Sequence, residues 1–443
     1  MLLFRENLSM AAPFDRTNPR LFYGWWIVAF AGCCLLFSEP TVSVFAFGVF
    51  LKAVSADLHV GRGAVSFGFT IHNLGTAAIS PFIGRLIDRF GVRRVALPAS
   101  LLIGIVIISA KWIGSSVSQY YVFYLALGLI GPGAGVVAYG AIVARWFDRH
   151  RGLALGLTGF GTGIAAMIYP PVAQRLIAIY GWRSAYALLG TAILVIPFFV
   201  LWLFIKDDPA QMGLYPDGVA PSFPQKSVKR NLPGLTWSEI WPTRTFWLFV
   251  FAFFLAGASV HACVLHLAAL LSDRGASAQA AANAVSIVGI AMLFGRTGSG
   301  YFLDRFFAPR VCLVIFGQSA LGIAVLASGA SGPVAILAGF LVGLAFGAEV
   351  EVIAYLVSRY FGLRSFGTAY GVCFSSFVLA GAVGTYVMGV GFDRTRSYTT
   401  PLILFFVLML AAALLFTRLG PYRFAVGTVS ETTSLPVVSE AAS

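Results

Sequence analysis

A series of long apolar segments, repeated from one end of the chain to the other, constrains this sequence more than any other feature. A helix of about 20 apolar residues crosses the roughly 30 Å hydrocarbon core of a bilayer. Segments of that length follow one another near 23–51, 64–84, 94–113, 119–144, 152–178, 184–205, 245–271, 279–302, 311–329, 333–358, 366–391 and 400–418. The sequence therefore predicts an all-α integral membrane protein with twelve transmembrane helices.

The composition leads to the same class. Hydrophobic residues make up 59% of the 443 residues and charged residues 11%, whereas a soluble domain carries roughly a quarter charged residues. A net charge of +13 would suggest a nucleic-acid partner in a soluble chain, but here the basic residues cluster between apolar runs. The five cysteines lie within apolar runs, without metal-like spacing. We expect the lipid bilayer as partner, and no nucleic acid, metal or cofactor.

The distribution of Lys and Arg predicts the orientation. With the N-terminus inside the cell, about 21 of the 30 basic residues fall on the cytoplasmic side and about eight on the other. We therefore expect both termini in the cytoplasm and the protein in the cell (plasma or inner) membrane. The longest internal hydrophilic stretch is rich in Pro and Lys, with little to pack, and divides the spans six and six. The predicted units are a tail (1–22), a six-helix bundle (23–205), a cytoplasmic linker (206–243), a second six-helix bundle (244–419) and a second tail (420–443).

Two internal sequence repeats indicate that the two halves of the chain are copies of one unit. Residues 84–94 (GRLIDRFGVRR) are repeated more weakly at residues 300–310 (GYFLDRFFAPR), with the Gly and the Asp-Arg-Phe in register. Arg145-Trp-Phe is repeated as Arg359-Tyr-Phe 214 positions later, close to the 216 positions that separate the first pair. Because each copy has an even number of helices, the two copies have the same orientation, as in transporters built from parallel repeats.

These motifs resemble the major facilitator superfamily across essentially all twelve spans. The connection between the second and third spans carries the superfamily's signature in Gly84, Asp88, Arg89, Gly91, Arg93 and Arg94. Within the superfamily, the chain is similar to monocarboxylate and oxalate/formate transporters at Tyr23-Gly24-Trp25, at residues 145–157 and at residues 209–218. The resemblance implies two pseudo-symmetric bundles, functional as a monomer, that alternate access to a central site.

The resemblance also implies that residues 84–94 form a conformational gate. In the superfamily the acid at the Asp88 position holds the bundles together on the cytoplasmic side when the carrier opens outward. The second copy keeps Asp304 and Arg305 but loses the Gly and the paired basic residues that follow. We therefore expect an asymmetric gate.

Ionisable side chains at membrane depth are costly and mark functional sites by default. This chain has a short set of them: Glu39, His72, His261, His266, Arg296, Glu349 and Glu351. Arg296 is the leading candidate for the substrate site, because a guanidinium can bind a carboxylate through two parallel hydrogen bonds. The related carriers also engage the substrate carboxylate with an Arg in the eighth helix. The alternative is an ion pair with a neighbouring acid.

Proton coupling has no obvious carrier beside Arg296. Proton-coupled monocarboxylate carriers often have an acid four residues before that Arg, where this chain has Met292. Any coupling proton then falls to Glu349, Glu351, Glu39 or His266.

Each of these candidate residues could instead have a purely structural role. Glu349 and Glu351 point to opposite sides of one helix, and we favour Glu349 as cavity-facing over a structural ion pair. His266 could bind substrate or a proton, or could simply be satisfied by a backbone carbonyl. Glu39 precedes a helix-kinking Pro and could line the pore or form a buried pair. Tyr139 could donate a hydrogen bond to a substrate carboxylate or serve packing alone.

The sequence thus predicts a secondary active transporter of small organic anions, with monocarboxylates as the expected class, working by proton symport or anion exchange. A proton-coupled exporter of cationic or amphipathic compounds is the first alternative, supported by three intramembrane Glu against one Arg. A transporter-like membrane sensor is the second. An enzyme is not expected, since no nucleophile–base or paired-carboxylate set is present.

Overall fold

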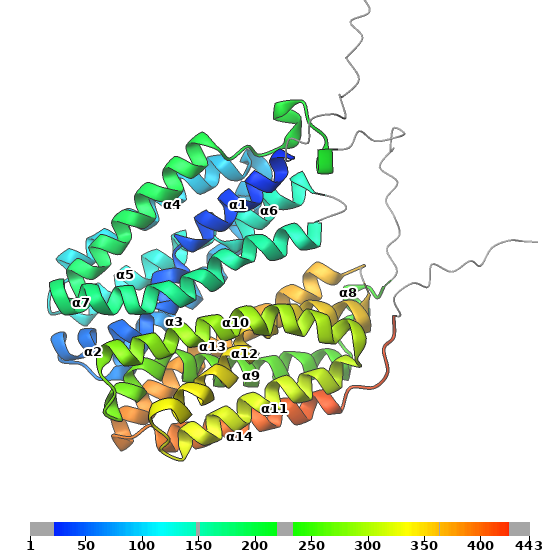
Figure 1. Ribbon diagram of the computed structural model, residues 1–443. Coiled ribbons are helices and arrows are strands. Elements are labelled where there is room, and N and C mark those ends of the chain that lie inside the picture. The colour runs from blue at the N-terminus through cyan, green and yellow to red at the C-terminus, as the bar shows by residue number, and fades with distance from the viewer. Residues whose placement is uncertain (1–21, 148–150, 219–233, 363, 425–443) are drawn as a thin grey trace, which may run out of the picture.

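The computed structural model describes residues 22–147, 151–218, 234–362 and 364–424, which fold into helices arranged as two bundles (Figure 1). The first bundle contains α1 to α7 and the second α8 to α14. The predicted all-α fold with two six-helix bundles is confirmed. We call the end of the molecule that carries residues 206–218 and 234–243 the linker end, and the other end, which carries residues 58–61 and 274–277, the opposite end.

The first bundle begins with an interrupted span. A π-helical turn, Thr41–Phe45, separates its first helix from its second. A 3-10 turn, Gly131–Ala134, similarly separates α5 from α6. The helices are α1 (Tyr23–Leu36), α2 (Phe47–Asp57), α3 (Arg62–Phe90), α4 (Val92–Ser109), α5 (Val117–Ile130), α6 (Val136–Trp146) and α7 (Arg151–Leu203).

Both interruptions lie inside predicted spans, 23–51 and 119–144; a kink was expected at Pro40, and the structure has a full break there and a second one at Gly131–Ala134. Pro40 lacks an amide hydrogen, so the helix before it cannot continue its hydrogen-bond ladder through that position. In the fourth span, Pro132 between two glycines has the same effect. Broken helices at membrane depth are tolerated only where other groups satisfy the freed backbone.

The predicted count of twelve spans agrees with the helices of the described residues, because one long helix contains two spans and two further spans are less apolar or interrupted. Nine helices there are long and apolar enough to cross a membrane. One of them, α7, contains two spans, because Gly181 has a positive φ of 76° and reverses the chain. The α1–α2 pair and the more polar α3 provide the remaining two spans.

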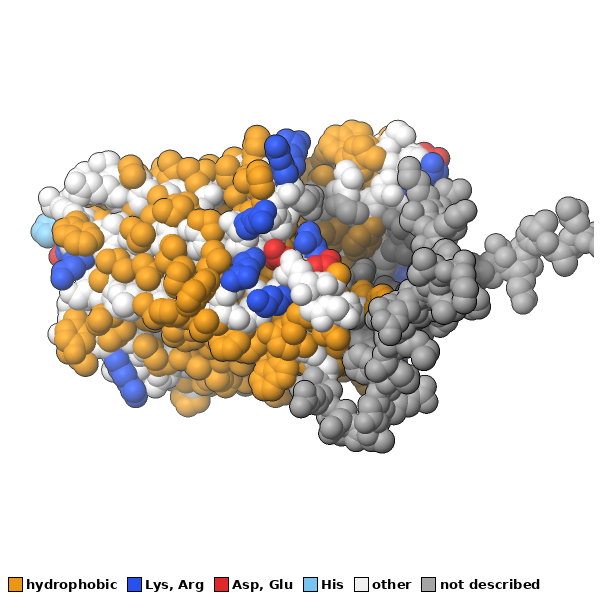
Figure 2. Space-filling model, turned by 90° about the horizontal axis from the view of Figure 1, so that it is seen from above, with side chains coloured by type: hydrophobic (Ala, Val, Ile, Leu, Met, Phe, Trp, Pro, Cys, Tyr) orange, Lys and Arg blue, Asp and Glu red, His pale blue; other side chains and the backbone are white. Residues whose placement is uncertain are grey.

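The second bundle is built from longer, uninterrupted helices. These are α9 (Arg244–Asp273), α10 (Ala278–Arg305), α11 (Ala308–Ala327), α12 (Gly332–Phe361), α13 (Phe366–Thr395) and α14 (Thr399–Thr417), preceded by the short α8 (Trp237–Ile240). Hydrophobic side chains cover most of the outer face in Figure 2, and Lys and Arg gather toward the linker end of that face. The chain is thus a multi-pass membrane protein with a lipid-facing apolar surface.

The described parts of the linker are packed, although the sequence suggested little to pack there. The amide of Leu235 donates to the carbonyl of Phe361 at 2.9 Å, and Ile240 is fully buried. Thr236 and Glu239 form a capping box at the start of α8, and the Thr236 backbone amide holds the pKa of Glu239 below its usual range. Residues 219–233 lie outside the described part of the chain.

Close packing of α10 against α12 depends on a row of glycines. A Cβ atom on Gly347 would collide with the Met292 carbonyl oxygen, and one on Gly343 would come within 2.9 Å of the Ala291 Cβ. Gly343 and Gly347, one turn apart on α12, therefore form a small-residue seam that faces α10.

We expect Gly347→Val to destabilise the protein by roughly 1–3 kcal/mol, because overpacking at a backbone contact forces the two helices apart. The measurement is thermal unfolding of the detergent-purified protein. Gly371→Val is the matched control, since a Cβ at Gly371 would meet no heavy atom within 4 Å. Equal loss of stability in both variants would contradict the assignment of the seam.

Candidate functional site

Arg296 lies where the two bundles touch. Its Nε is 2.9 Å from Glu351 Oε1, close enough for an ion pair although the N–H is not aligned for a hydrogen bond. Its Nη1 donates across the interface to the carbonyl of Gly159 on α7, at a long 3.4 Å. The side chain of Arg296 is 25% exposed. Among the described residues, Nη2 has no acceptor, so one edge of the guanidinium can accept a ligand.

The structure corrects the choice between the two acids of α12. Glu349, expected to face the cavity, is 0% exposed and points into the second bundle, where neither carboxylate oxygen has a hydrogen-bond partner among the described residues. Glu351 is the accessible one and pairs with Arg296. The reason is helical geometry: Glu351 shares a face with Gly347, which contacts α10, and Glu349 lies about 200° around the helix.

Glu351 places an acid beside Arg296, although the position four residues before Arg296 is Met292. Glu351 reaches Arg296 from a neighbouring helix rather than from one turn earlier on the same helix. The phenol of Tyr370, on α13, lies near both charges. Sequence reasoning missed Tyr370 and the Gly159 carbonyl, because neither residue type is unusual in a membrane span.

A large apolar pocket of about 600 Å³ lies elsewhere and does not include Arg296. It is lined by α10, α11 and the middle of α12, and several of its aromatic residues, among them Phe294 and Phe306, are largely exposed on the outer surface. Its position on the lipid-facing side separates it from the interface between the bundles.

The bundles are in contact at the opposite end and apart at the linker end (Figure 1). Gly84 lies three heptads after Gly63, on the face of α3 that contacts α13, and a Cβ there would meet nothing within 4 Å. Gly156 and Gly300, about one turn beyond Gly159 and Arg296 toward the linker end, also face open space. Arg296 is therefore the contact nearest the linker end among the polar bonds described between the bundles.

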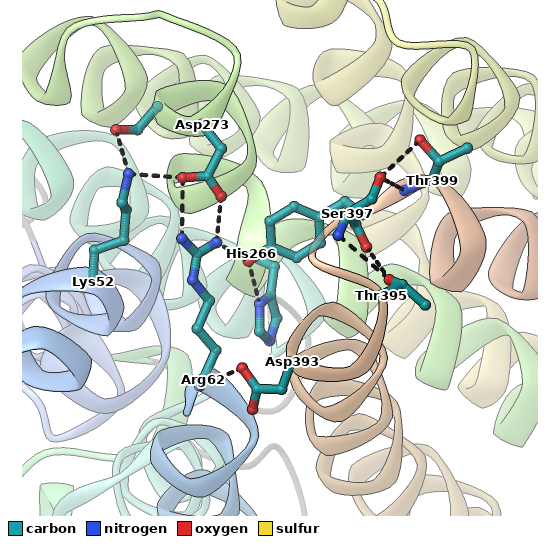
Figure 3. A network of polar contacts seen from close by, with 10 residues as sticks. Lys52, Arg62, His266, Asp273, Asp393, Thr395, Ser397 and Thr399 are labelled. Atoms are coloured by element: carbon teal, nitrogen blue, oxygen red, sulfur yellow. Dashed lines mark hydrogen bonds and ion pairs between the residues drawn. The ribbon is translucent and has the colours of Figure 1, made fainter. Parts of the chain in front are cut away.

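Charged residues close the opposite end (Figure 3). Arg62, at the start of α3, forms two hydrogen bonds with the carboxylate of Asp273 at the end of α9, one of them at 3.0 Å. Lys52 of α2 donates to the same carboxylate at 2.8 Å. The backbone amides of Arg62 and Gly63 donate to Asp393 of α13 at 2.9 and 2.8 Å. We call Lys52, Arg62, Asp273, Asp393 and Tyr398 the polar latch.

His266 belongs to the latch region and is fully buried. Its Nε2 is 3.1 Å from the Thr385 carbonyl, which can only accept, so we assign the ring proton to Nε2. Its Nδ1 then accepts from Tyr398, whose hydroxyl also receives a hydrogen bond from Arg62. The alternative of a histidine satisfied by a backbone carbonyl matches this geometry. A direct substrate contact of His266 would require the latch to open.

Two further candidates lie within the first bundle. Glu39 is 3% exposed and His72 4%, and their Oε1 and Nε2 atoms are 2.9 Å apart, so Glu39 forms a buried pair rather than lining a pore. Tyr139 is 0% exposed, and its hydroxyl lies beside the Cys34 thiol. No described contact brings Tyr139 to Arg296, and the packing alternative fits its position.

The residues predicted to form the gate gather at the linker end. The amide of Arg93 donates to Asp207 at 2.8 Å, and a Cβ on Gly91 would press against the same carboxylate. Arg305 covers the ring of Tyr301 at 3.7 Å. These contacts stay within one bundle and its linker. The side chains of Asp88 and Asp304 lie outside the described part of the structure, so their gate role stays a prediction.

Comparison with known proteins agrees with this architecture. The family model described as Major Facilitator Superfamily matches residues 31–385. An uncharacterized MFS-type transporter of Escherichia coli is 26% identical over 76% of this chain and 81% of its own. Human monocarboxylate transporter 11 is 27% identical over 77% of this chain and 72% of its own. The oxalate:formate antiporter of Oxalobacter formigenes is 26% identical over 85% and 88%.

A solved structure shows the same fold. The bacterial homologue of the human lysosomal transporter Spinster, in an inward-facing and unoccupied conformation, superposes with a TM-score of 0.67 at 15% identity, covering 90% of this chain and 97% of that one. Fold, family model and sequence relatives agree, and the chain belongs to the Major Facilitator Superfamily of membrane transporters.

Proposed function

We propose that this transporter carries small organic anions of the monocarboxylate class by alternating access around Arg296. The supporting observation is the guanidinium at the contact between the bundles, whose Nη2 has no acceptor among the described residues, with open space about one turn away toward the linker end. A carboxylate can bind such an edge bidentately. The names of two relatives, a monocarboxylate transporter and an oxalate:formate antiporter, support the same substrate class.

Charge balance explains why transport should involve proton symport or anion exchange. Arg296 and Glu351 together are neutral when ionised, so a bound monocarboxylate adds one uncompensated negative charge at membrane depth. An uncompensated charge there costs several kcal/mol. A proton that moves with the substrate, or a second anion that leaves in exchange, removes this cost.

We place the linker end in the cytoplasm, because most Lys and Arg residues lie there and cytoplasmic loops carry the excess of basic residues. In that orientation the conformation described is open to the cytoplasm and closed on the outside by the polar latch.

The function is tested with purified protein in liposomes, by uptake of radiolabelled lactate and oxalate. We expect saturable uptake that unlabelled carboxylates inhibit and that lipophilic cations such as tetraphenylphosphonium do not. Competition by the cation alone would favour an exporter of cationic compounds. Carboxylate binding without flux, read by thermal shift, would favour a sensor.

A further inference from the structure

The buried pair of Glu39 and His72 occupies an unusual place in the fold. Glu39 sits in the break of the first span, between α1 and the π-helical turn, and His72 approaches from α3. The break of the fourth span lies beside them, since a Cβ on Gly131 would be 3.0 Å from Glu39 Oε2. Discontinuous helices at membrane depth commonly hold the coupling ion of a secondary transporter.

The break is stabilised by local hydroxyl groups rather than by the acid. Ser38 donates to the Leu35 carbonyl at 2.7 Å, Thr41 to the Ser38 carbonyl at 2.6 Å and Ser43 to the Glu39 carbonyl at 3.3 Å. The carboxylate of Glu39 is thus not needed to satisfy the freed backbone. Its described polar partner is the His72 imidazole, 2.9 Å away without hydrogen-bond alignment.

The surroundings of the pair are aromatic and carry few titratable groups. The ring of Tyr124, on α5, stands edge-on to the imidazole at 6.4 Å between centroids, and its hydroxyl is 3.3 Å from that of Tyr186 on α7. Asn73 Oδ1 lies 3.3 Å from His72 Nδ1. Tyr169 of α7 packs against Phe37 beside the break. No Lys, Arg or second carboxylate contacts the pair among the described residues.

We infer that Glu39 and His72 form a proton-binding site, separate from the substrate site at Arg296, that gains and releases one proton in each transport cycle. With one proton between them the pair carries no net charge, whether the proton is on the imidazolium or on the carboxylic acid. Loss of that proton leaves a lone carboxylate in an apolar enclosure, and gain of a second leaves a lone imidazolium. Both states are costly where solvent is excluded, so the occluded pair retains one proton.

Movement between the bundles can open this enclosure. Thr70, half a turn from His72 on the same helix, donates to the Ala382 carbonyl of α13 at 3.0 Å across the bundle interface. The α1 helix contacts α7 where Gly161 meets Gly32, next to the Gly159 carbonyl that receives the Arg296 bond. Opening of the latch therefore removes the contact that α13 makes with α3 half a turn from His72, and with it part of the cover over the pair.

The coupling of this proton to substrate rests on the proposed carboxylate transport. The experiment therefore has two arms, and the first does not depend on any substrate. In the first arm, infrared spectra of the purified, substrate-free protein are recorded across a pH titration. We expect a pH-dependent carboxyl band that disappears in Glu39→Gln and shifts its midpoint in His72→Gln. An unchanged band in Glu39→Gln overturns the proton site, whatever the substrate is.

The second arm uses liposomes loaded with a pH-sensitive dye and given labelled lactate or oxalate. We expect substrate-driven proton movement in the wild type, at least a tenfold loss of it in Glu39→Gln, and a smaller loss of substrate counterflow in the same liposomes. Glu39→Asp should restore proton movement, and thermal unfolding checks that each variant is folded.

Proton movement that survives Glu39→Gln but is lost in Glu351→Gln assigns the proton to the substrate site and overturns the inference. Failure of the wild type to carry any carboxylate refutes the proposed function, and the infrared arm still decides the proton site.

Discussion

Replacing Arg296 with alanine is expected to abolish carboxylate transport. Among the described residues, the Arg296 guanidinium is the Lys or Arg group that bridges the bundles away from the polar latch, and hydrogen bonds to a charged group each contribute about 1.5–3 kcal/mol. Loss of two such bonds corresponds to a decrease in affinity of roughly 100-fold or more. The measurement is equilibrium binding and initial uptake of labelled lactate and oxalate in the same preparation.

Two further variants distinguish a loss of substrate binding from a loss of folding stability. Arg296→Lys keeps the charge without the planar fork and should retain weak binding. Arg296→Ala also leaves Glu351 without its partner, so Arg296→Gln combined with Glu351→Gln removes both charges together. We expect the double variant to match the wild type in thermal stability and still to bind no carboxylate. Normal uptake by Arg296→Ala would refute the assigned role.

Breaking the polar latch is expected to shift the conformational equilibrium toward a form open at the opposite end. Asp273 receives bonds from Arg62 and Lys52, which belong to the first bundle, while Asp273 belongs to the second. Asp273→Asn removes both ion pairs without changing the shape of the side chain. A loss of roughly 1–3 kcal/mol corresponds to about a 5- to 150-fold increase in the ratio of the open to the closed form.

The opening can be followed with a single cysteine in an otherwise cysteine-free protein. Ala382→Cys places the thiol at a residue that is 0% exposed at the interface. We expect a membrane-impermeant maleimide to label it faster when Asp273→Asn is present. Lys111→Gln, which removes an exposed charge at the same end of the molecule, is the control. A charge swap, Arg62→Asp with Asp273→Arg, should slow labelling again, and unchanged labelling in Asp273→Asn would contradict the latch.

The latch illustrates what a single sequence leaves undetermined. Arg62 and Asp273 are more than 200 positions apart, at the ends of helices, where charged residues are ordinary. No spacing or motif connects them, because their contact depends on how the bundles meet. The same holds for Glu351, whose partner Arg296 lies on a different helix. Sequence reasoning identified both residues as intramembrane charges but could not pair them.

The extent of the helix interruptions was not predicted for a different reason. Hydropathy measures whether a segment is apolar enough to cross the bilayer, and the segments around Glu39 and Gly131 satisfy that criterion. Whether a proline or glycine breaks the helix depends on the hydroxyls and neighbouring helices that satisfy the freed carbonyls, such as Ser38 and Thr41 here.

The sequence by itself determined the membrane class, the all-α fold, the duplicated architecture and the transporter family. Those properties follow from the length and repetition of apolar segments and from local motifs, because the bilayer leaves a helix few alternatives. Only the tertiary structure decided which acid faces Arg296, that Glu349 is buried, that Glu39 pairs with His72 and that the bundles meet at one end. These outcomes depend on the rotation of each helix about its axis and on packing between distant segments, which periodicity within one segment does not specify.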